Sequence, residues 1–249
     1  MPVELEIANG VGILHLRRPE SANALNAEML NQISRMQRQL QRDRSVRVLV
    51  TVGEGKGFCA GSDLHEQARF TPSQAERSQL LEAKVCREFL RLPQPTIAGV
   101  HGYALGGGLF LATHHDFQIV NAEARLGLPE VRLGWNPTFG IHRLCQLVGV
   151  GAASRWMMQG SEFTAAEAVE KGCITQVVEG SDDVLGACKE LAEKLLELPS
   201  GGLTAIKQAI WGASGAKMIR CDVREARLYR KCLALSAAQA SPRRNAKKH

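Results

Sequence analysis

Residues 97–108 read IAGVHGYALGGG, and residues 50–64 read VTVGEGKGFCAGSDL. Each stretch is an apolar run that ends in a turn of glycine and other small residues. Such turns let a ligand approach the backbone closely and leave amide N–H groups free. Two turns of this kind can each offer one N–H group to the same carbonyl oxygen, which is the arrangement of an oxyanion hole.

The glycine triplet at residues 106–108 is expected to open a helix, so that its N–H groups lie at the positive end of the helix dipole. The spacing matches neither the GxGxxG nucleotide fingerprint nor a phosphate-binding loop ending in GK[ST]. An alternative interpretation of the triplet is a close contact between helix and sheet with no ligand. Glu130, in the sequence GLPE, is an acid that can move protons beside such a hole.

The composition is that of an ordinary globular enzyme. The chain has 249 residues, 45% of them hydrophobic and 22% charged, and no run approaches the roughly 20 apolar residues that span a bilayer. The N-terminus has neither a basic start nor an apolar signal core, so we expect a cytoplasmic protein with no membrane partner. The net charge of +6, part of which comes from Arg243, Arg244, Lys247 and Lys248, suits a phosphate-bearing ligand.

Seven cysteines are scattered through the chain without a CxxC pair. The odd number and the spacing argue against a disulfide framework and against a zinc site, and we expect no metal. Cys59 lies inside the first small-residue turn, where a nucleophile has to be considered. No histidine lies in an obvious position to orient it, so we favour a packing role for its sulfur.

Periodic patterns predict an α/β fold. Alternating or continuous apolar runs predict strands at residues 3–7, 12–16, 46–52, 96–100 and 117–120. Helical spacing predicts helices at residues 26–43, 73–92, 105–112, 144–158, 164–171, 183–198 and 203–239. The first two strands, joined by Asn9 and Gly10, form a predicted hairpin, and the later strand–helix alternation favours parallel pairing. The break at residues 199–202 separates a core, 1–198, from a helical region, 199–249, that ends in the basic tail.

Together, the two loops resemble the crotonase family, also called the enoyl-CoA hydratase/isomerase family, and the resemblance covers most of the chain. The motifs that carry it are LRRPESANAL at 16–25, FCAGSDL at 58–64, GYALGGG at 102–108 and LPEVRLG at 128–134, with Pro137, Gly140 and Leu144. The resemblance implies a spiral of ββα units and C-terminal helices that form homotrimers, often paired into hexamers. It implies an acyl-CoA thioester as substrate, with coenzyme A as part of that substrate and no other cofactor.

The resemblance also implies roles in catalysis. Ser62, where many members have alanine, and Gly107 would donate backbone N–H groups to the thioester carbonyl, and Glu130 would be the acid/base. The second glutamate of hydratases is replaced by Phe110, which can neither accept a proton nor orient water. We therefore expect double-bond isomerisation over hydration, with Phe110 keeping water from the dienolate. Hydration by Glu130 alone, decarboxylation and thioester hydrolysis stay open, as does a CoA-binding relative without activity.

Further residues are expected near the substrate. The resemblance implies that Ser21, Ala22, Ala60, Leu64 and His65 line the CoA path, with His65 where lysine is frequent. Asp63 belongs to the same loop and either contacts substrate or caps the next helix; we favour the cap. Trp135, with Asn136 and Phe139, either shapes the acyl pocket or packs between subunits. Residues 67–79 are expected to set the depth of that pocket.

A different class of function is suggested by arginines on the first predicted helix, Arg35, Arg38, Arg42 and Arg44. A basic helix can bind nucleic acid, as it does in some relatives of the family. We favour the simpler interpretation of a solvated helix face, so no nucleic-acid partner is expected.

Overall fold

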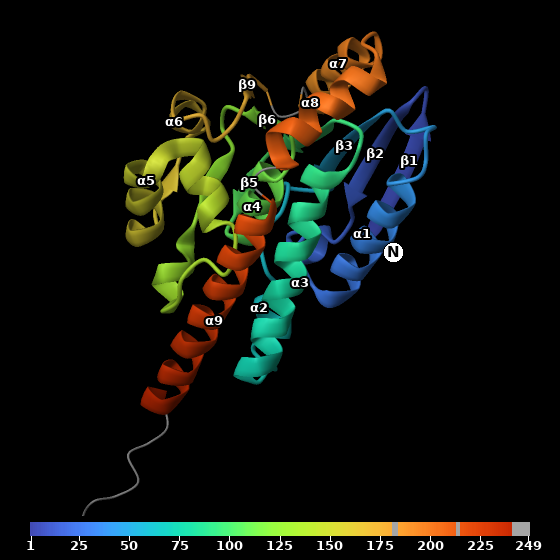
Figure 1. Ribbon diagram of the computed structural model, residues 1–249. Helices are drawn as coiled ribbons and strands as arrows, with labels where there is room; N and C mark the ends of the chain where they lie inside the picture. The colour runs from blue at the N-terminus through green and yellow to red at the C-terminus, as the bar shows by residue number, and fades with distance from the viewer. Residues whose placement is uncertain (181–183, 213–214, 241–249) are drawn as a thin grey trace, which may run out of the picture.

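A six-stranded sheet forms the centre of the molecule. The computed structural model describes residues 1–180, 184–212 and 215–240 (Figure 1). The strands of this sheet, in spatial order, are β1 (Val3–Ala8), β2 (Val11–Leu16), β3 (Val48–Gly53), β4 (Thr96–Val100), β6 (Phe117–Asn121) and β9 (Gln176–Val178). The β1–β2 pair is antiparallel and the other neighbours are parallel, which confirms the predicted hairpin and the predicted α/β class.

A second, smaller sheet was not predicted from the sequence. It contains β5 (Tyr103–Leu105), β7 (Arg125–Gly127) and β8 (Glu162–Phe163). Strands of two or three residues are too short to show alternation, which explains why the pattern missed them. After β4 the chain forms β5 and then a helix, and after β6 it forms β7 and then a short 3-10 helix. The same strand–strand–helix unit is therefore repeated along the chain.

Helices cover both faces of the large sheet. They are η1 (Pro19–Ser21), α1 (Ala27–Leu40), α2 (Leu64–Gln67), α3 (Pro72–Arg91), α4 (Gly107–Thr113), η2 (Pro129–Leu133), α5 (Ile141–Gln159), α6 (Ala165–Glu170), α7 (Val184–Leu196), α8 (Ser200–Gly212) and α9 (Gly215–Ala240). Apolar residues of α7 pack on one face, against side chains such as Val50 and Ile97. The helices α1, α3 and α4 pack on the other face, around Leu49 and Ala98. No helix in the described ranges is both long and apolar enough to span a membrane.

The predicted inward face of α3 was partly wrong. Leu80 and Leu81 were expected inside, yet both are only partly buried. Gln79 and Glu82 are fully buried in their place, at 0% exposure. A helix packs one face against the core, and the buried face of α3 includes polar side chains. A search for apolar residues at helical spacing does not detect such positions.

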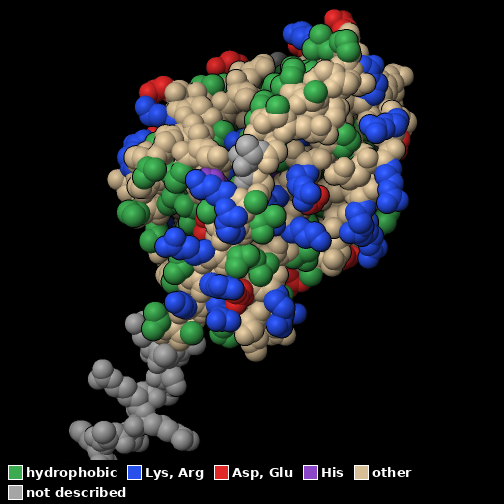
Figure 2. Space-filling model, viewed as in Figure 1, with side chains coloured by type: hydrophobic (Ala, Val, Ile, Leu, Met, Phe, Trp, Pro, Cys, Tyr) green, Lys and Arg blue, Asp and Glu red, His purple; other side chains and the backbone are tan. Residues whose placement is uncertain are grey.

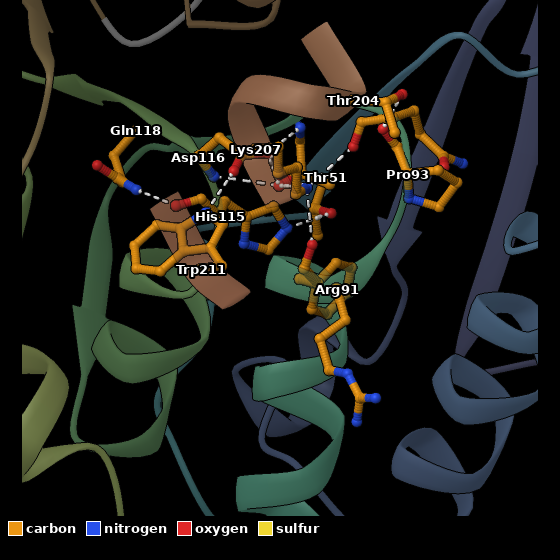
Figure 3. A network of polar contacts seen from close by, with 12 residues as sticks. Thr51, Arg91, Pro93, His115, Asp116, Gln118, Thr204, Lys207 and Trp211 are labelled. Carbon is orange, nitrogen blue, oxygen red and sulfur yellow. Dashed lines mark hydrogen bonds and ion pairs between the residues drawn. The ribbon is translucent and has the colours of Figure 1, made fainter. Parts of the chain in front are cut away.

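The C-terminal helices pack onto the core through buried polar contacts. On α8, Lys207 places its Nζ atom 2.6 Å from Oδ2 of Asp116, while the indole of Trp211 donates to Oδ1 of the same carboxylate at 3.0 Å (Figure 3). The backbone N–H of Thr96, at the start of β4, donates to Asp116 as well. Burial lowers the pKa of Lys207, and the adjacent Asp116 opposes that shift. Removing one partner of such a buried pair is strongly destabilising, so this network fixes α8 at the N-terminal ends of the neighbouring strands β4 and β6.

Helix α9 lies beside α3 along much of its length (Figure 1). Ion pairs join the two helices, Arg87 with Asp222 and Arg230 with Glu76. The single helix expected over residues 203–239 is described as α8 and α9 on either side of residues 213–214. The division at residue 198 stays a prediction, and the predicted basic tail at 241–249 lies outside the described residues.

The backbone pairing of the two glycine-containing loops is the feature that builds the site. The amide of Leu105 donates to the carbonyl of Cys59 at 3.1 Å, and the amide of Phe58 donates to the carbonyl of Tyr103 at 3.0 Å. A Cβ atom at Gly108 would lie 2.2 Å from the carbonyl oxygen of Cys59. Glycine at position 108 is therefore required for helix α4 to approach the first loop.

We expect the Gly108→Ala variant to be destabilised by roughly 1–3 kcal/mol, because the methyl group must push the two loops apart. The matched control is Gly151→Ala, on α5, where an added Cβ meets nothing within 4 Å. Urea unfolding of both variants and the parent measures the effect. Equal stability of Gly108→Ala and the parent would contradict the tight approach described here.

Candidate active site

Two backbone amides lie together where the paired loops end. Ser62 follows the first loop, and Gly107 is the first residue of α4. An added Cβ at Gly107 would be 3.5 Å from the Ser62 nitrogen, and one at Gly61 would be 3.1 Å from the Gly107 nitrogen. Neither amide donates to another group within the described part of the chain. The pair of free donors at the start of a helix has the form of an oxyanion hole.

Glu130 lies beside these donors. It is the second residue of η2, and its Oε1 atom would be 2.8 Å from a Cβ added at Gly106. Gly106 has φ of 52° and ψ of −124°, so both its conformation and the adjacent carboxylate exclude a side chain there. The acid that the sequence singled out is thus brought next to the glycine triplet.

The environment of Glu130 suits proton transfer near neutral pH. Burial raises the pKa of Glu130 to about 7. Its Oε2 atom is buried and has no hydrogen-bond partner among the described residues. A carboxyl group that has one unpartnered oxygen and a pKa near the working pH can act as a base in one step and as an acid in the next.

A small cavity of about 80 Å³ connects the donors with the acid. Six of the predicted site residues line it, namely Ala60, Ser62, Leu64, Gly107, Glu130 and Trp135. Gln67 and Gln79, at the two ends of the segment expected to set pocket depth, line it as well. Among the described residues, the lining of the larger cavity between α3, α8 and α9, about 430 Å³, contains no carboxylate, histidine, serine or cysteine, and its buried Lys207 is paired with Asp116.

The other predicted site residues lie outside this lining. Asp63 caps α2 by accepting from the Glu66 amide at 3.1 Å, and it pairs with Arg18 at 3.0 Å, which is the structural role that we favoured. His65 is exposed on α2. Ser21 and Ala22 lie at η1, where the Ala22 carbonyl accepts from the Ala60 amide and so links this turn to the first loop.

Aromatic side chains support the loop after Glu130. Phe110 is 1% exposed and packs in the core against Phe139, with ring centroids 5.4 Å apart, so the structure places it behind the cavity and not in its lining. Trp135 lines the cavity and meets Tyr229 of α9 edge-on at 5.6 Å. The hydroxyl of Tyr229 donates to Gln67 at 2.7 Å, so α9 braces two lining residues of the pocket.

Sequence reasoning missed two polar residues at the site, Thr138 and Glu82. Gln79 and Thr138 line the cavity and are hydrogen-bonded to each other, and Glu82 accepts a hydrogen bond from the Ser62 hydroxyl at 2.8 Å. The available signal for Glu82 was an acid within the buried stripe of α3, one turn before Cys86 and two turns before Phe89.

Cys59, which was considered as a nucleophile, and two buried histidines have structural roles. Burial raises the pKa of Cys59 to about 12, so its thiol is neutral, and the sulfur donates to the Asn23 carbonyl. His114 and His115 are buried and bond to backbone carbonyls of their own helix through Nδ1. Within residues 1–180, 184–212 and 215–240, no cluster of three His, Cys, Asp or Glu residues is arranged to hold a metal ion.

Basic side chains gather on the face that carries α3 and α9 (Figure 2). Three of the four arginines noted in the first helical segment, Arg35, Arg38 and Arg42, line a shallow surface hollow on α1 and its C-terminal end, together with the acid Asp43. The hollow contains no aromatic side chain on which a base could stack, and this composition suits a solvated helix face.

Comparison with known proteins agrees with this geometry. The sequence profile of the enoyl-CoA hydratase/isomerase family matches residues 6–246. The short-chain-enoyl-CoA hydratase of Clostridium acetobutylicum is 34% identical over 89% of this chain and 83% of the relative. The crotonyl-CoA hydratase of Syntrophomonas wolfei is 35% identical over 77% of this chain and 74% of the relative. The crystal structure of an enoyl-CoA hydratase from Bacillus anthracis superposes with a TM-score of 0.82 at 29% identity, covering 96% of this chain and 95% of that one. The fold, the paired loops and these matches together show that the chain belongs to the enoyl-CoA hydratase/isomerase, or crotonase, family.

Proposed function

We propose that the protein transfers protons on an enoyl-CoA thioester, with Glu130 as the single acid/base and the Ser62 and Gly107 amides as the oxyanion hole. The observation that carries this proposal is the unpartnered, buried Oε2 atom of Glu130 beside two free backbone donors. Ala60, Leu64 and Trp135 would line the substrate, because they share the cavity with these groups.

The proposed chemistry is a shift of the double bond. The Glu130 carboxylate takes a proton from carbon 2 of a 3-enoyl thioester, and the electron pair moves onto the carbonyl oxygen to form a dienolate. The two amides hold the negative oxygen; one such donor typically contributes roughly 3 kcal/mol to transition-state stabilisation. Protonated Glu130 then returns the proton to carbon 4, which gives the 2-enoyl thioester. One carboxyl group suffices for both steps, and position 110 on α4 supplies a phenyl ring in place of a second acid.

Hydration is the second candidate, because the three similar proteins described above are all named as enoyl-CoA or crotonyl-CoA hydratases. In that reaction a water oxygen would bond to carbon 3 while a proton is delivered to carbon 2. Glu130 alone would have to activate the water and supply the proton.

Replacement of the acid tests the proposed role of Glu130 directly. We expect Glu130→Gln to lower kcat by about 10²–10⁴, because glutamine cannot exchange a proton. The control is Glu123→Gln, an exposed acid in the turn before β7. In the parent, kcat/KM should rise as the pH increases through about 7, where burial places the pKa of Glu130 and the carboxylate becomes the populated form. Turnover by Glu130→Gln at the parent rate would exclude Glu130 as the acid/base.

A substrate panel separates the two reactions. Purified protein is given crotonyl-CoA, a 3-enoyl-CoA and a saturated acyl-CoA, and hydration, isomerisation and release of free CoA are followed in parallel. We expect isomerisation to be the fastest, since Glu130 supplies the one carboxyl group among the described residues that line the cavity. Fast hydration with no isomerisation would replace the first candidate by the second. Absence of turnover with intact Glu130 would favour a CoA-thioester binding protein.

We propose in addition that copies of the chain associate through the C-terminal helices, as a trimer or hexamer. The side chains of Ile206, Ile210 and Ile219 are 61%, 57% and 43% exposed on α8 and α9, which is unusual for apolar residues of a lone chain. Light scattering after size exclusion should give three or six times the chain mass, and Ile206→Asp with Ile210→Asp should lower it. A parent protein that elutes as a monomer would refute this association.

A further inference from the structure

A second carboxyl group lies directly behind the donors of the hole. Glu82, on α3, is fully buried, and its Oε2 atom accepts from the Ser62 hydroxyl at 2.8 Å. The same Oε2 atom would be 3.1 Å from a Cβ added at Gly107. One carboxyl oxygen therefore contacts the side chain of Ser62 and also lies close to the position that a side chain at Gly107 would occupy.

The surroundings of Glu82 do not favour a negative charge. The carboxylates of Glu66 on α2 and Glu130 on η2 both disfavour the ionised form of Glu82. Among the described residues, no lysine or arginine forms an ion pair with it; the nearby cation on the same helix, Arg87, is paired with Asp222. Among the described residues, its hydrogen-bond partners are Ser62 and Gln79, the latter with an Nε2–Oε1 distance of 3.5 Å.

The titratable groups packed around Glu82 from other positions stay neutral. Burial raises the pKa values of Cys59 and Tyr229 to about 12, and it raises the pKa of Cys86 as well. None of these groups can supply a positive charge to balance a carboxylate. An uncompensated buried charge costs several kcal/mol, so the group is expected to hold its proton instead.

We infer that Glu82 is a positioning residue: as a neutral carboxylic acid it holds Ser62 in place, and its ionisation switches the oxyanion hole off. An enolate oxygen bound at the Ser62 and Gly107 amides carries a developing negative charge. A carboxylate behind the same two residues repels that charge in a site with little water, where Coulomb interactions are strong. The effect on turnover rests on the proposed function, whereas the neutral state of Glu82 does not.

The protonation behaviour of Glu82 supports this inference. Burial, aided by Glu66 and Glu130, raises its pKa from the ordinary 4.5 to about 8, while the Ser62 hydrogen bond opposes the shift. The Glu130 carboxylate contributes to the upward shift of Glu82, so the two carboxyls titrate as a pair. Coupling of this kind favours a state near neutral pH in which one carboxyl is ionised and the other keeps its proton.

The first measurement needs no substrate. Urea unfolding is followed from about pH 5 to about pH 9 for the parent, for Glu82→Gln and for Glu88→Gln, a partly exposed acid on the same helix. Between pH 4.5 and about 8 the unfolded chain releases the Glu82 proton and the folded chain keeps it, so unfolding is favoured as the pH rises. The stability of the parent relative to Glu82→Gln should therefore fall over that range and level off above it. A difference that does not change with pH would overturn the inference.

The second measurement uses turnover. The kcat/KM of the parent should fall about tenfold per pH unit above the pKa of Glu82, and Glu82→Gln should lack this fall while staying within about threefold of the parent at neutral pH. Ser62→Ala keeps the backbone donor and removes the hydroxyl that lowers the pKa of Glu82, so its alkaline fall should move to higher pH. Glu88→Gln should behave as the parent.

Each other outcome overturns the assignment. An alkaline fall that persists in Glu82→Gln assigns it to another group, and a loss of more than about 100-fold at neutral pH means that Glu82 itself delivers a proton. If Glu82→Gln does not fold, the Ser62→Ala variant tests the inference instead. An alkaline fall in kcat/KM at the same pH as in the parent, or at a lower pH, would contradict the inference. If the parent turns over no enoyl-CoA, the proposed function fails, while the unfolding data still decide whether Glu82 is neutral.

Discussion

Backbone pairing between the Cys59 loop and strand β5 is the constraint on which the site depends. Hydrogen bonds from Phe58 to Tyr103 and from Leu105 to Cys59 set two loops side by side that are more than 40 positions apart in the chain. The Ser62 and Gly107 amides then converge with no further adjustment, because each follows its loop by only two or three residues. Catalytic side chains can rotate, but this pair of donors is as rigid as the sheet that carries it, which is the preorganisation that an oxyanion hole requires.

The second constraint is electrostatic. The fold buries two carboxyl groups near one pair of donors, and each group is shifted upward in pKa chiefly because burial removes it from water. Such burial lowers stability at neutral pH, so it is not explained by folding alone. Strained or destabilised groups of this kind concentrate at functional sites. The same helix, α3, that covers the sheet supplies the hidden carboxyl, so packing and site chemistry share one element.

The sequence predicted the frame better than the details. The parallel strands and long helices were recognised because their apolar periods extend over many residues. The oxyanion hole and Glu130 were predicted from small-residue loops and family motifs, and the structure brings these residues together, while their catalytic roles stay predictions. The strands of the small sheet were missed because two or three residues have no measurable period. Glu82 was missed because the core-facing side of α3 was assigned from the positions of its leucines. In the structure, Gln79 and Glu82 face the core instead. Phe110 was expected beside the substrate, whereas the fold buries its ring in the core against Phe139, outside the cavity lining.

A different neighbouring group lies against each glycine of the triplet. The space of a side chain at Gly106 is occupied by the Glu130 carboxylate, at Gly107 by the Glu82 carboxylate, and at Gly108 by the Cys59 carbonyl. A side chain at any of these positions would therefore require a neighbour to move, a carboxylate at 106 and 107 and a backbone carbonyl at 108. Residues outside the cavity lining, such as those at positions 82 and 110, are the less obstructed positions at which the site can be changed. Engineering that aims to change the reaction while keeping the binding of the thioester should begin with these buried residues. The residues that line the cavity should be left unchanged.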